Sequence, residues 1–395
     1  MIHAAVIGVT GYGKFYLSQL LRLQKEGRIQ LDAMAVINPD EAIDEMDSVD
    51  RSQTKIYYSL DELLEQMAGK IDLCCIPVGI PDHASIAIKA IETGANILLE
   101  KPVAGSVGDA LKINSSAKKH GIEVMIGFQH LYQDVYHDLK NDLINGRLGK
   151  IKHMTLTGIW PRGHKYFERN AWAGRKKFDE KWVLDSPANN AFAHYLNLAL
   201  FLSSNQIEDS AVPLHVKQEL YRTYPIENFD TMALRAVLNS GVVLHAFLSH
   251  AGDEIADPKL LIHCDKGDII IFNGGVEVSE SDGNRQLQCS KSENLIRQEM
   301  FDAVIDVLEG IDRHRCSPEL AMAHTWLINA LNEFGNIHTL DRSFIREKGD
   351  HLIIPGLYDI FLRCAESFKL PAEIGGVPWA KESPEADCVD YRGIL

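Results

Sequence analysis

A glycine-rich turn near the N-terminus has the composition of a phosphate-binding loop. Gly8-Val9-Thr10-Gly11-Tyr12-Gly13 follows the apolar run AAVI and precedes a helical stretch. In the pattern GxGxxG, glycines allow a dinucleotide pyrophosphate to approach the backbone at a helix N-terminus. Thr10 stands at the second glycine position. The turn therefore predicts nucleotide binding by Gly8, Thr10, Gly11, Tyr12 and Gly13, and a tight strand-to-helix turn without a ligand is the alternative.

A lysine at the end of another apolar run is a second candidate for chemistry. The run ANILL leads into Glu100-Lys101-Pro102. Ligands of open α/β sheets bind outside the carboxyl ends of the strands, where the ammonium of Lys101 can hydrogen-bond to a substrate hydroxyl or carbonyl. Burial and a neighbouring positive charge would lower the pKa of this lysine toward a useful acid–base range. The alternative is a surface lysine at the start of a loop.

The elements that position these residues follow two different patterns. From Ile2 to about Gly127, short apolar runs alternate with helical stretches, which predicts a doubly wound parallel sheet. Beyond Gly127, closely spaced β-type runs predict an α+β unit with a large, mainly antiparallel sheet, covered by helices in QEMFDAVIDVLEG and SPELAMAHTWLINALNEFG. We expect an α/β chain with a nucleotide-binding domain at 1–127, a substrate-binding and oligomerisation domain at 128–349, and an extension at 350–395 packed on them.

The end of the second predicted strand bears on the choice of nucleotide. Asn38 stands where an acid normally binds the adenosine ribose hydroxyls, and its amide can still bind a diol. The following stretch, Pro39 to Asp50, contains acidic residues and no basic one. That stretch would repel a 2′-phosphate, so the sequence favours NAD over NADP. The alternative is a solvated helix face that never approaches a cofactor.

The order of several segments resembles the Gfo/Idh/MocA oxidoreductase family. The segments are Gly8–Gly13, Ile76–His83, AIETGANILLEKPVA, GFQH followed by LINGRLGKI, and the helix containing His194. The resemblance covers most of the chain, except the region past Gly349. It implies a Rossmann domain in which further residues contact the cofactor beside the glycine turn and Asn38, namely Pro77, Gly79, His83, Glu100, Lys101 and Gln129.

The resemblance also implies a second catalytic set from the substrate domain. The family commonly has Asp-x-x-x-His on a helix, where residues i and i+4 share one face. Here Asn190 takes the aspartate place and His194 the histidine place. An Asn can orient an imidazole but cannot take a proton, so proton transfer would fall to His194 and Lys101. Asp185 is an alternative carboxylate, and a core histidine is the alternative for His194.

A loop rich in aromatic and basic residues is the candidate substrate site. Residues 160–182 hold seven Lys and Arg against three Asp and Glu, an excess of +4 in a chain of −15. Aromatic rings stack on sugar faces, while Arg and Asn bind hydroxyl or acid groups. The predicted contacts are Trp160, Arg162, Tyr166, Arg169, Asn170 and Trp172, with His250 as a further polar candidate. A solvated loop or a subunit contact is the alternative.

These expectations combine into one preferred function and two alternatives. The resemblance implies an NAD-dependent oxidoreductase that moves hydride between the nicotinamide and a sugar, polyol or sugar-acid carbon, in a homodimer or homotetramer. Asn190 and the imperfect glycine motif leave open a catalytically silent nucleotide- or sugar-binding regulator of the same fold. An NAD-redox-cycling glycosidase or epimerase also stays open.

Composition limits the remaining classes of function. The 395 residues are 46% hydrophobic and 24% charged, as in ordinary globular proteins, and fit two or three domains. The net charge of −15 argues against nucleic acid and anionic membranes as partners. An N-terminus without signal-peptide features and seven cysteines without metal-ligand spacing predict a cytoplasmic protein with no metal.

Overall fold

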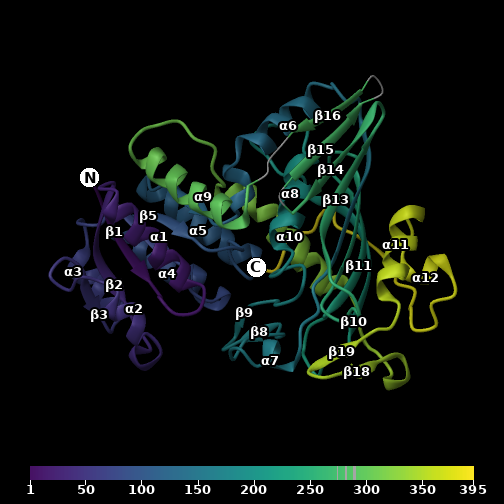
Figure 1. Cartoon of the computed structure of the whole chain (residues 1–395), viewed down its shortest axis with the longest axis horizontal. Coiled ribbons are helices and arrows are strands. Elements are labelled where there is room, and N and C mark those ends of the chain that lie inside the picture. The colour runs from purple at the N-terminus through teal and green to yellow at the C-terminus, as the bar shows by residue number, and fades with distance from the viewer. Residues whose placement is uncertain (274, 281–282, 288–290) are drawn as a thin grey trace. The chain divides into compact units, whose positions relative to one another are not determined.

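The computed structural model describes residues 1–273, 275–280, 283–287 and 291–395. The chain forms two compact units that alternate along the sequence (Figure 1). The first comprises 1–104, 108–133 and 294–321, and the second comprises 105–107, 134–293 and 322–395. The whole of residues 350–395 therefore belongs to the second unit.

The first unit is built on a parallel six-stranded sheet in the order β3-β2-β1-β4-β5-β6. Its strands are mostly buried, as expected for a sheet covered on both faces. The order reverses between β1 and β4, and ligands of such sheets bind outside the carboxyl ends at this point. The predicted doubly wound fold is confirmed. The strands are β1 (Ile2–Ile7), β2 (Ile29–Ala35), β3 (Lys55–Tyr57), β4 (Leu73–Ile76), β5 (Asn96–Leu99) and β6 (Val124–Ile126).

Helices alternate with these strands along the chain. They are α1 (Gly13–Lys25), α2 (Ile43–Asp47), α3 (Leu60–Met67), α4 (His83–Glu92) and α5 (Val107–His120). The second strand is shorter than predicted, because β2 ends at Ala35 and Asn38 is exposed. Asn38 instead precedes a short 3-10 helix, η1 (Pro39–Glu41), which leads into α2.

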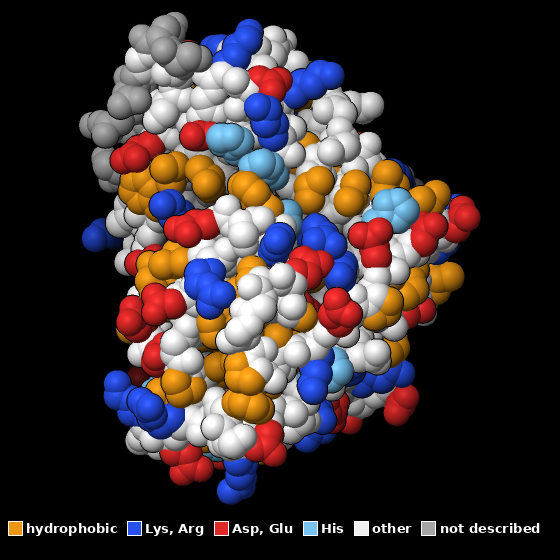
Figure 2. Space-filling view, turned by 90° about the vertical axis from the view of Figure 1, so that its right-hand side faces the viewer, with side chains coloured by type: hydrophobic (Ala, Val, Ile, Leu, Met, Phe, Trp, Pro, Cys, Tyr) orange, Lys and Arg blue, Asp and Glu red, His pale blue; other side chains and the backbone are white. Residues whose placement is uncertain are grey.

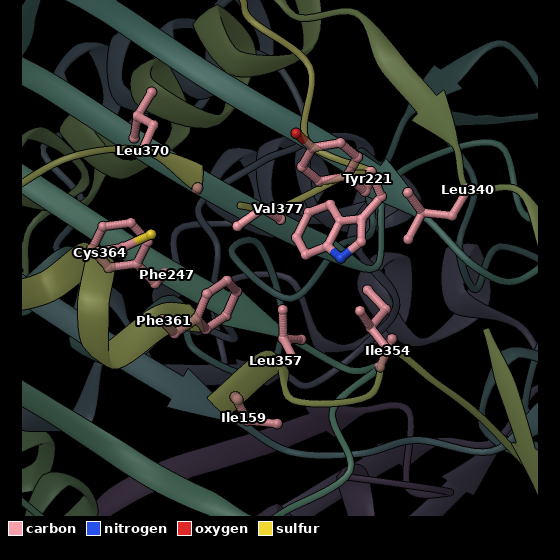
Figure 3. Close-up of a cluster of buried hydrophobic side chains, with 13 residues drawn as sticks. Ile159, Tyr221, Phe247, Leu340, Ile354, Leu357, Phe361, Cys364, Leu370 and Val377 are labelled. Carbon is pink, nitrogen blue, oxygen red and sulfur yellow. The ribbon is translucent and has the colours of Figure 1, made fainter. Parts of the chain in front are cut away.

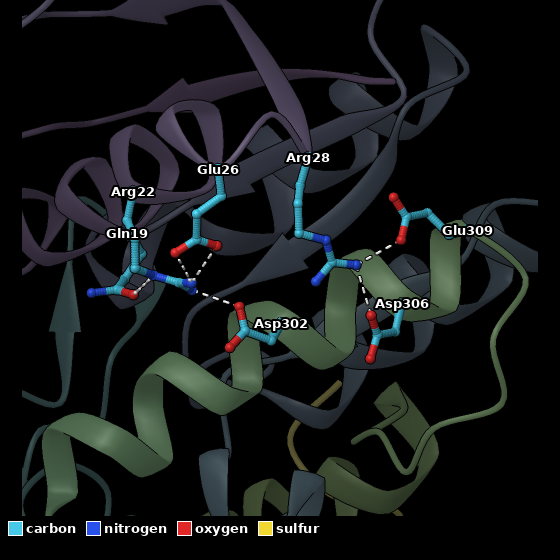
Figure 4. A network of polar contacts seen from close by, with 7 residues as sticks. All are labelled: Gln19, Arg22, Glu26, Arg28, Asp302, Asp306 and Glu309. Carbon is cyan, nitrogen blue, oxygen red and sulfur yellow. Dashed lines mark hydrogen bonds and ion pairs between the residues drawn. The ribbon is translucent and has the colours of Figure 1, made fainter.

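A helix from late in the chain packs onto the first unit. Figure 4 shows α9 (Glu293–Leu308) joined to the α1 region by ion pairs. Arg22 donates to Asp302 at 2.6 Å, and Arg28 donates to Asp306 at 2.7 Å and to Glu309 at 2.6 Å. We expected this helix to cover the second sheet, and that expectation was wrong. An apolar stripe predicts burial but does not identify the surface that buries it.

The second unit contains a ten-stranded mixed sheet, mainly antiparallel, as predicted. Its order is β16-β15-β14-β13-β7-β12-β11-β10-β17, and β20 also pairs with β10. The predicted meander is β10–β11–β12. Strand β7 lies between β12 and β13, parallel to β12. The strands are β7 (Ile151–Ile159), β10 (Pro213–Arg222), β11 (Thr231–Leu238), β12 (Val243–Ser249), β13 (Ala256–Cys264), β14 (Gly267–Phe272), β15 (Gly275–Glu280), β16 (Gly283–Leu287), β17 (Ile337–Thr339) and β20 (Glu385–Asp387).

The remaining elements of this unit flank the sheet. Helices α6 (Asp134–Ile144) and α8 (Ala193–Leu202) contact each other, and α8 also contacts β7 and β13. Helix α10 (Pro318–Phe334) begins in the first unit and continues in the second. Three short elements lie in the predicted substrate loop: α7 (His164–Phe167), β8 (Lys177–Phe178) and β9 (Lys181–Trp182).

The C-terminal region covers the other face of the large sheet. It contains the hairpin β18 (Arg346–Lys348) and β19 (His351–Ile353), α11 (Leu357–Ser367) and α12 (Pro371–Ile374). Figure 3 shows the buried cluster in which α11 side chains such as Phe361 meet Phe247 of β12. Trp379 belongs to this cluster, with its ring 4.9 Å from that of Tyr221. Figure 2 views the molecule from the right-hand side of Figure 1, and on this face hydrophobic side chains are interspersed with charged ones.

The cysteines of the described chain are free and buried. Burial raises the pKa of the Cys74 thiol to about 12, so this group is not a reactive thiolate. Cys289 lies outside the described residues. Within the described ranges there is no group of three or more His, Cys, Asp or Glu side chains arranged to hold a metal ion. No helix among these residues has the length and hydropathy to cross a bilayer.

Candidate functional site

The glycine turn after β1 has the compact geometry that its sequence predicts. Gly8 (φ +88°) and Gly11 (φ +57°) occupy the left-handed region, which favours glycine. A Cβ atom on Gly13 would collide with the carbonyl oxygen of Gly8, so only glycine fits there. Gly11 thus supplies the backbone freedom that Thr10 lacks. The first turn of α1 contains no acidic residue, which leaves its positive dipole end available to an anion.

Glu100 anchors the segment that carries Lys101. The Glu100 side chain is buried, accepts a hydrogen bond from the Lys101 backbone N–H at 2.9 Å, and accepts another from the Tyr16 hydroxyl at 3.2 Å. Burial raises the pKa of the Glu100 carboxyl. A Cβ on Gly127 would lie 3.0 Å from Glu100 Oε1, so the backbone at the start of the GFQH segment packs directly against the Glu100 carboxyl. The side chain of Lys101 is half-buried, and its backbone is held in place because Glu100 contacts Tyr16 of α1 and Gly127 after β6.

His83 joins the loops that follow β4 and β5. Its Nδ1 lies 2.8 Å from the carbonyl oxygen of Pro102, and its Nε2 lies 3.1 Å from that of Val78. Burial lowers the pKa of His83, and a neutral ring donates through only one nitrogen, which we assign to the shorter contact. The ring is fully enclosed, so this geometry supports a positioning role. The Lys101–Pro102 peptide is cis.

The structure places all the predicted cofactor residues after the carboxyl ends of parallel strands. Gly8, Thr10, Gly11, Tyr12 and Gly13 follow β1, Asn38 follows β2, Pro77, Gly79 and His83 follow β4, Glu100 and Lys101 follow β5, and Gln129 follows β6. A Cβ on Gly8 would lie 3.2 Å from Val78 Cγ1, so the loops after β1 and β4 pack closely. Gln129 is buried in the 3-10 helix η3 (Gln129–Tyr132).

In the second unit, Asp185 is the centre of a hydrogen-bonded group. Its buried carboxylate accepts bonds from the Gly174 N–H at 2.7 Å, from Asn190 Nδ2 at 3.0 Å and from the Arg169 guanidinium at 3.2 Å. Asn190 Nδ2 also lies 3.5 Å from the Tyr166 hydroxyl. Asp185, Asn190 and Tyr166, which are up to 24 positions apart in the sequence, thus form one polar chain.

The expected helical Asn190-x-x-x-His194 pair has a different local structure. Helix α8 begins at Ala193, so His194 lies in its first turn, whereas Asn190 lies in the preceding turn. Pro187 starts that turn, and its carbonyl accepts from the Phe192 N–H at 2.9 Å. Sequence spacing alone could not show where the helix begins. His194 is half-buried, and Asn197, one turn later, is fully buried.

Arginines surround Tyr166 in the predicted substrate loop. The guanidinium carbons of Arg169 and Arg162 lie 3.9 Å and 5.0 Å from its ring centroid. Burial, and then the charge of Asp185, raise the pKa of Tyr166 to about 12, so its hydroxyl keeps its proton at neutral pH. Arg169 also lies 5.3 Å from the Trp172 ring, and Asn170 Oδ1 accepts from the Trp172 N–H at 3.1 Å.

His250 lies against this group as a neutral ring. Burial lowers its pKa to about 3, so Nδ1 carries the proton and donates to the Trp160 carbonyl at 2.8 Å. Nε2 is then an acceptor, and it has no hydrogen-bond partner among the residues that the structure describes. Its ring centroid is 5.3 Å from that of Tyr166. Trp160 stacks on Phe192 at 4.8 Å, and its indole N–H donates to Asp257 at 2.9 Å.

The C-terminal hairpin supports the substrate loop through residues that sequence reasoning missed. The Tyr224 hydroxyl donates to the Arg162 carbonyl at 2.5 Å and accepts from the Leu352 N–H at 2.7 Å. The Asp350 carbonyl accepts from the His164 N–H at 2.9 Å. A Cβ on Gly163 would collide with the Asp350 side chain, which makes this glycine the only local signal of the contact.

Residues 2–128 match a family model described as "Oxidoreductase family, NAD-binding Rossmann fold" (GFO_IDH_MocA). Over these residues the chain is similar to the Rossmann domain of the Gfo/Idh/MocA oxidoreductase family. The resemblance inferred from the Glu100-Lys101-Pro102 tripeptide and its neighbouring segments is thereby confirmed. The family itself is an NAD-binding one.

Similarity to curated proteins is concentrated in part of the chain. The myo-inositol dehydrogenase Hyg17 of Streptomyces leeuwenhoekii is 25% identical over 152 residues, which cover 38% of this chain and 44% of that protein. The first curated relatives are matched over 32 to 44% of their own length, so the chain covers less than half of each.

Two solved structures share the fold of this chain. The WlbA dehydrogenase from Bordetella pertussis, in complex with NADH and UDP-GlcNAcA, has a TM-score of 0.68 at 17% identity, covering 84% of this chain and 95% of that one. A super-repressor mutant of Gal80p from Saccharomyces cerevisiae has a TM-score of 0.67 at 13% identity, with 84% and 95% covered. These likenesses establish the fold of the chain and leave activity to the site residues.

Proposed function

We propose that this protein is an NAD-dependent oxidoreductase that moves hydride between the nicotinamide and a CH–OH or carbonyl carbon of a sugar, polyol or sugar acid. The observation that carries the proposal is the anchored Glu100-Lys101-Pro102 segment at the carboxyl edge of a Gfo/Idh/MocA Rossmann sheet. The glycine turn Gly8–Gly13 suits a dinucleotide, because Gly8 and Gly11 have positive φ and the first turn of α1 contains no acidic residue that would repel a phosphate. NAD, when bound, supplies the hydride acceptor or donor.

The chain's own residues divide the remaining work. Lys101 and His194 take up or return the proton of the substrate hydroxyl group. Asp185 is held by three donors, so it orients Asn190 and Arg169 and does not serve as a base. Tyr166 keeps its hydroxyl proton and is a hydrogen-bond donor. The buried, neutral ring of His250 packs against the Tyr166 ring.

The substrate class follows from these donors and acceptors. The loop presents arginines and aromatic rings next to hydroxyl and amide groups, a combination that suits a polyhydroxylated or acidic substrate. We also propose that the cofactor is NAD and not NADP, and that Trp160, Asn170 and Trp172 are further substrate contacts. The protein is proposed to be a cytoplasmic homodimer or homotetramer.

The test begins with mass spectrometry of the denatured protein for a co-purified nicotinamide nucleotide. A panel of sugars, polyols and sugar acids then follows, read by the absorbance of the reduced nicotinamide. Lys101→Met should lower kcat by a factor of about 10²–10⁴, the usual contribution of general acid–base catalysis. Lys89→Met is the matched control, because that lysine is exposed and pairs only with the exposed Asp61 in the described structure.

Each alternative function has its own outcome. Wild-type turnover by Lys101→Met would remove the lysine from the mechanism. Sugar binding without any redox turnover would favour the silent regulator. A retained nucleotide together with glycoside cleavage or epimerisation, and no net change in reduced nicotinamide, would favour the redox-cycling enzyme.

A further inference from the structure

An ion pair links the glycine turn after β1 to the segment after β2. Lys14, the second residue of α1, places Nζ 2.7 Å from Oε1 of Glu45 in α2. The Lys14 side chain is 54% exposed and the Glu45 side chain 8% exposed. The pair thus joins a lysine that faces solvent to a carboxylate that is almost completely buried.

In Rossmann domains, the turn after the first strand and the segment after the second strand bind the pyrophosphate and the adenosine ribose of a dinucleotide. The end of the second strand distinguishes a ribose hydroxyl from a 2′-phosphate, with an acid for NAD and a nearby Arg for NADP. In this chain the end of β2 offers Asn38, which is uncharged and cannot repel a phosphate. Any discrimination against a 2′-phosphate must therefore come from residues other than Asn38, such as those of the acidic stretch 39–50.

Glu45 cannot release Lys14 easily. Its Oε2 atom is buried and has no hydrogen-bond partner in the described part of the chain, so the carboxylate depends on the lysine for charge compensation. Breaking a pair in which one charge is buried leaves that charge uncompensated, which is strongly unfavourable. The hydrogen bond between the two side chains lowers the pKa of Glu45 and raises that of Lys14, so both stay charged near neutral pH.

We infer that Glu45 determines nucleotide specificity by occupying Lys14, the cation that a 2′-phosphate would otherwise recruit. The exposed acids Asp40, Glu41, Asp44 and Asp47 around α2 add to the same unfavourable potential. This inference rests on the nucleotide binding in the proposed function. It assigns the choice between NAD and NADP to a pair outside the glycine motif.

The test compares the dissociation constants of NADH and NADPH, measured by nicotinamide fluorescence titration of the full chain. Glu45→Gln should improve NADPH binding relative to NADH by about tenfold, because a charge-assisted contact to phosphate becomes available. The gain should disappear in Glu45→Gln/Lys14→Gln. That double variant separates Lys14 from Arg297, whose guanidinium lies 5.9 Å from the Tyr12 ring. Glu41→Gln, which removes an exposed acid outside the pair, should change the ratio by less than about threefold.

The outcomes separate the inference from the proposed function. Wild-type protein that binds neither nucleotide contradicts the proposed function. NADH binding with an unchanged NADPH ratio in a folded Glu45→Gln contradicts the inference, as does a gain that persists in the double variant or appears equally in Glu41→Gln. If Glu45→Gln does not fold, the same NADPH and NADH titrations on Lys14→Met test the inference. An NADPH:NADH ratio within about twofold of wild type supports an occupied lysine, and a selective loss of NADPH binding overturns it.

Discussion

Replacing Glu373 by Gln should detach part of the C-terminal region from the large sheet. Glu373 of α12 binds Lys217 Nζ of β10 at 2.8 Å, the Arg235 guanidinium of β11 at 2.9 Å and the Leu370 N–H at 2.9 Å. Its side chain is 18% exposed. Burial alone would raise the pKa of this carboxyl, but the hydrogen bonds and charges of its partners lower it from 4.5 to about 2.

The magnitude follows from the linkage between proton binding and folding. A pKa lowered from 4.5 to about 2 corresponds to about 3 kcal/mol of stabilisation by the charged form. The glutamine amide would keep one hydrogen bond, so we expect Glu373→Gln to cost about 2 kcal/mol at pH 7. A group with a lowered pKa stabilises fully above its unfolded pKa and loses this contribution as the pH falls through the folded pKa. The difference between wild type and variant should therefore shrink between about pH 4.5 and pH 2.

Urea unfolding followed by tryptophan fluorescence measures this difference at pH 7, 5 and 3. Trp379 lies in the cluster that the C-terminal region forms with the sheet, so its emission reports on detachment. Glu366→Gln on the exposed side of α11 is the matched control, expected within about 0.5 kcal/mol of wild type. A loss below about 0.5 kcal/mol at pH 7 for Glu373→Gln, or a loss that stays constant down to pH 3, would refute the reasoning.

Three further predictions concern other parts of the chain. Burial lowers the pKa of Lys140 from 10.5 to about 7, so between these pH values the unfolded chain binds more protons than the folded chain. The Tm of wild type should therefore rise relative to that of Lys140→Met as the pH increases from 7 to 10. A Tm difference that stays constant over this range would contradict the reasoning. Tyr224→Phe removes the hydrogen bond to the Arg162 carbonyl and should cost about 1–2 kcal/mol, with faster tryptic cleavage after Arg162; unchanged cleavage would show that the hairpin does not hold the loop. Gly13→Ala should abolish NADH binding measured by fluorescence, because its Cβ would collide with Gly8, and retained affinity would contradict the role of the glycine turn.

The nucleotide-binding part could be predicted from local sequence to a large extent. Alternating apolar runs and helices identified the parallel sheet, since each βα repeat is a contiguous segment with its own periodicity. The residues chosen after β1, β4, β5 and β6 lie after the strand ends because the fold puts every loop of this kind on one edge. The boundary of β2 was less accurate, because apolar Ile37 extends the pattern past the last paired residue, Ala35. The pairing of Lys14 with Glu45 was not predicted.

The second unit depended more on tertiary structure. The meander β10–β11–β12 was visible in closely spaced runs, but the insertion of β7 beside β12 joins strands separated by more than 80 residues. The return of α9 to the first unit depends on pairs such as Arg28 with Asp306, whose partners are 278 positions apart. Periodicity predicts that a helix face will be buried, and only the packed chain determines what buries it.

The candidate substrate site divides along the same line. The sequence by itself determined which residue types were available in the loop: the arginines, the aromatic rings, and Asp185, Asn190 and His194. Only the tertiary structure decided that Asp185 is occupied by three donors, that Asn190 precedes α8, and that burial makes His250 neutral. Hydrogen-bond partners and pKa values depend on burial and on distances between atoms remote in sequence, and these are set only when the sheet and the C-terminal hairpin come together.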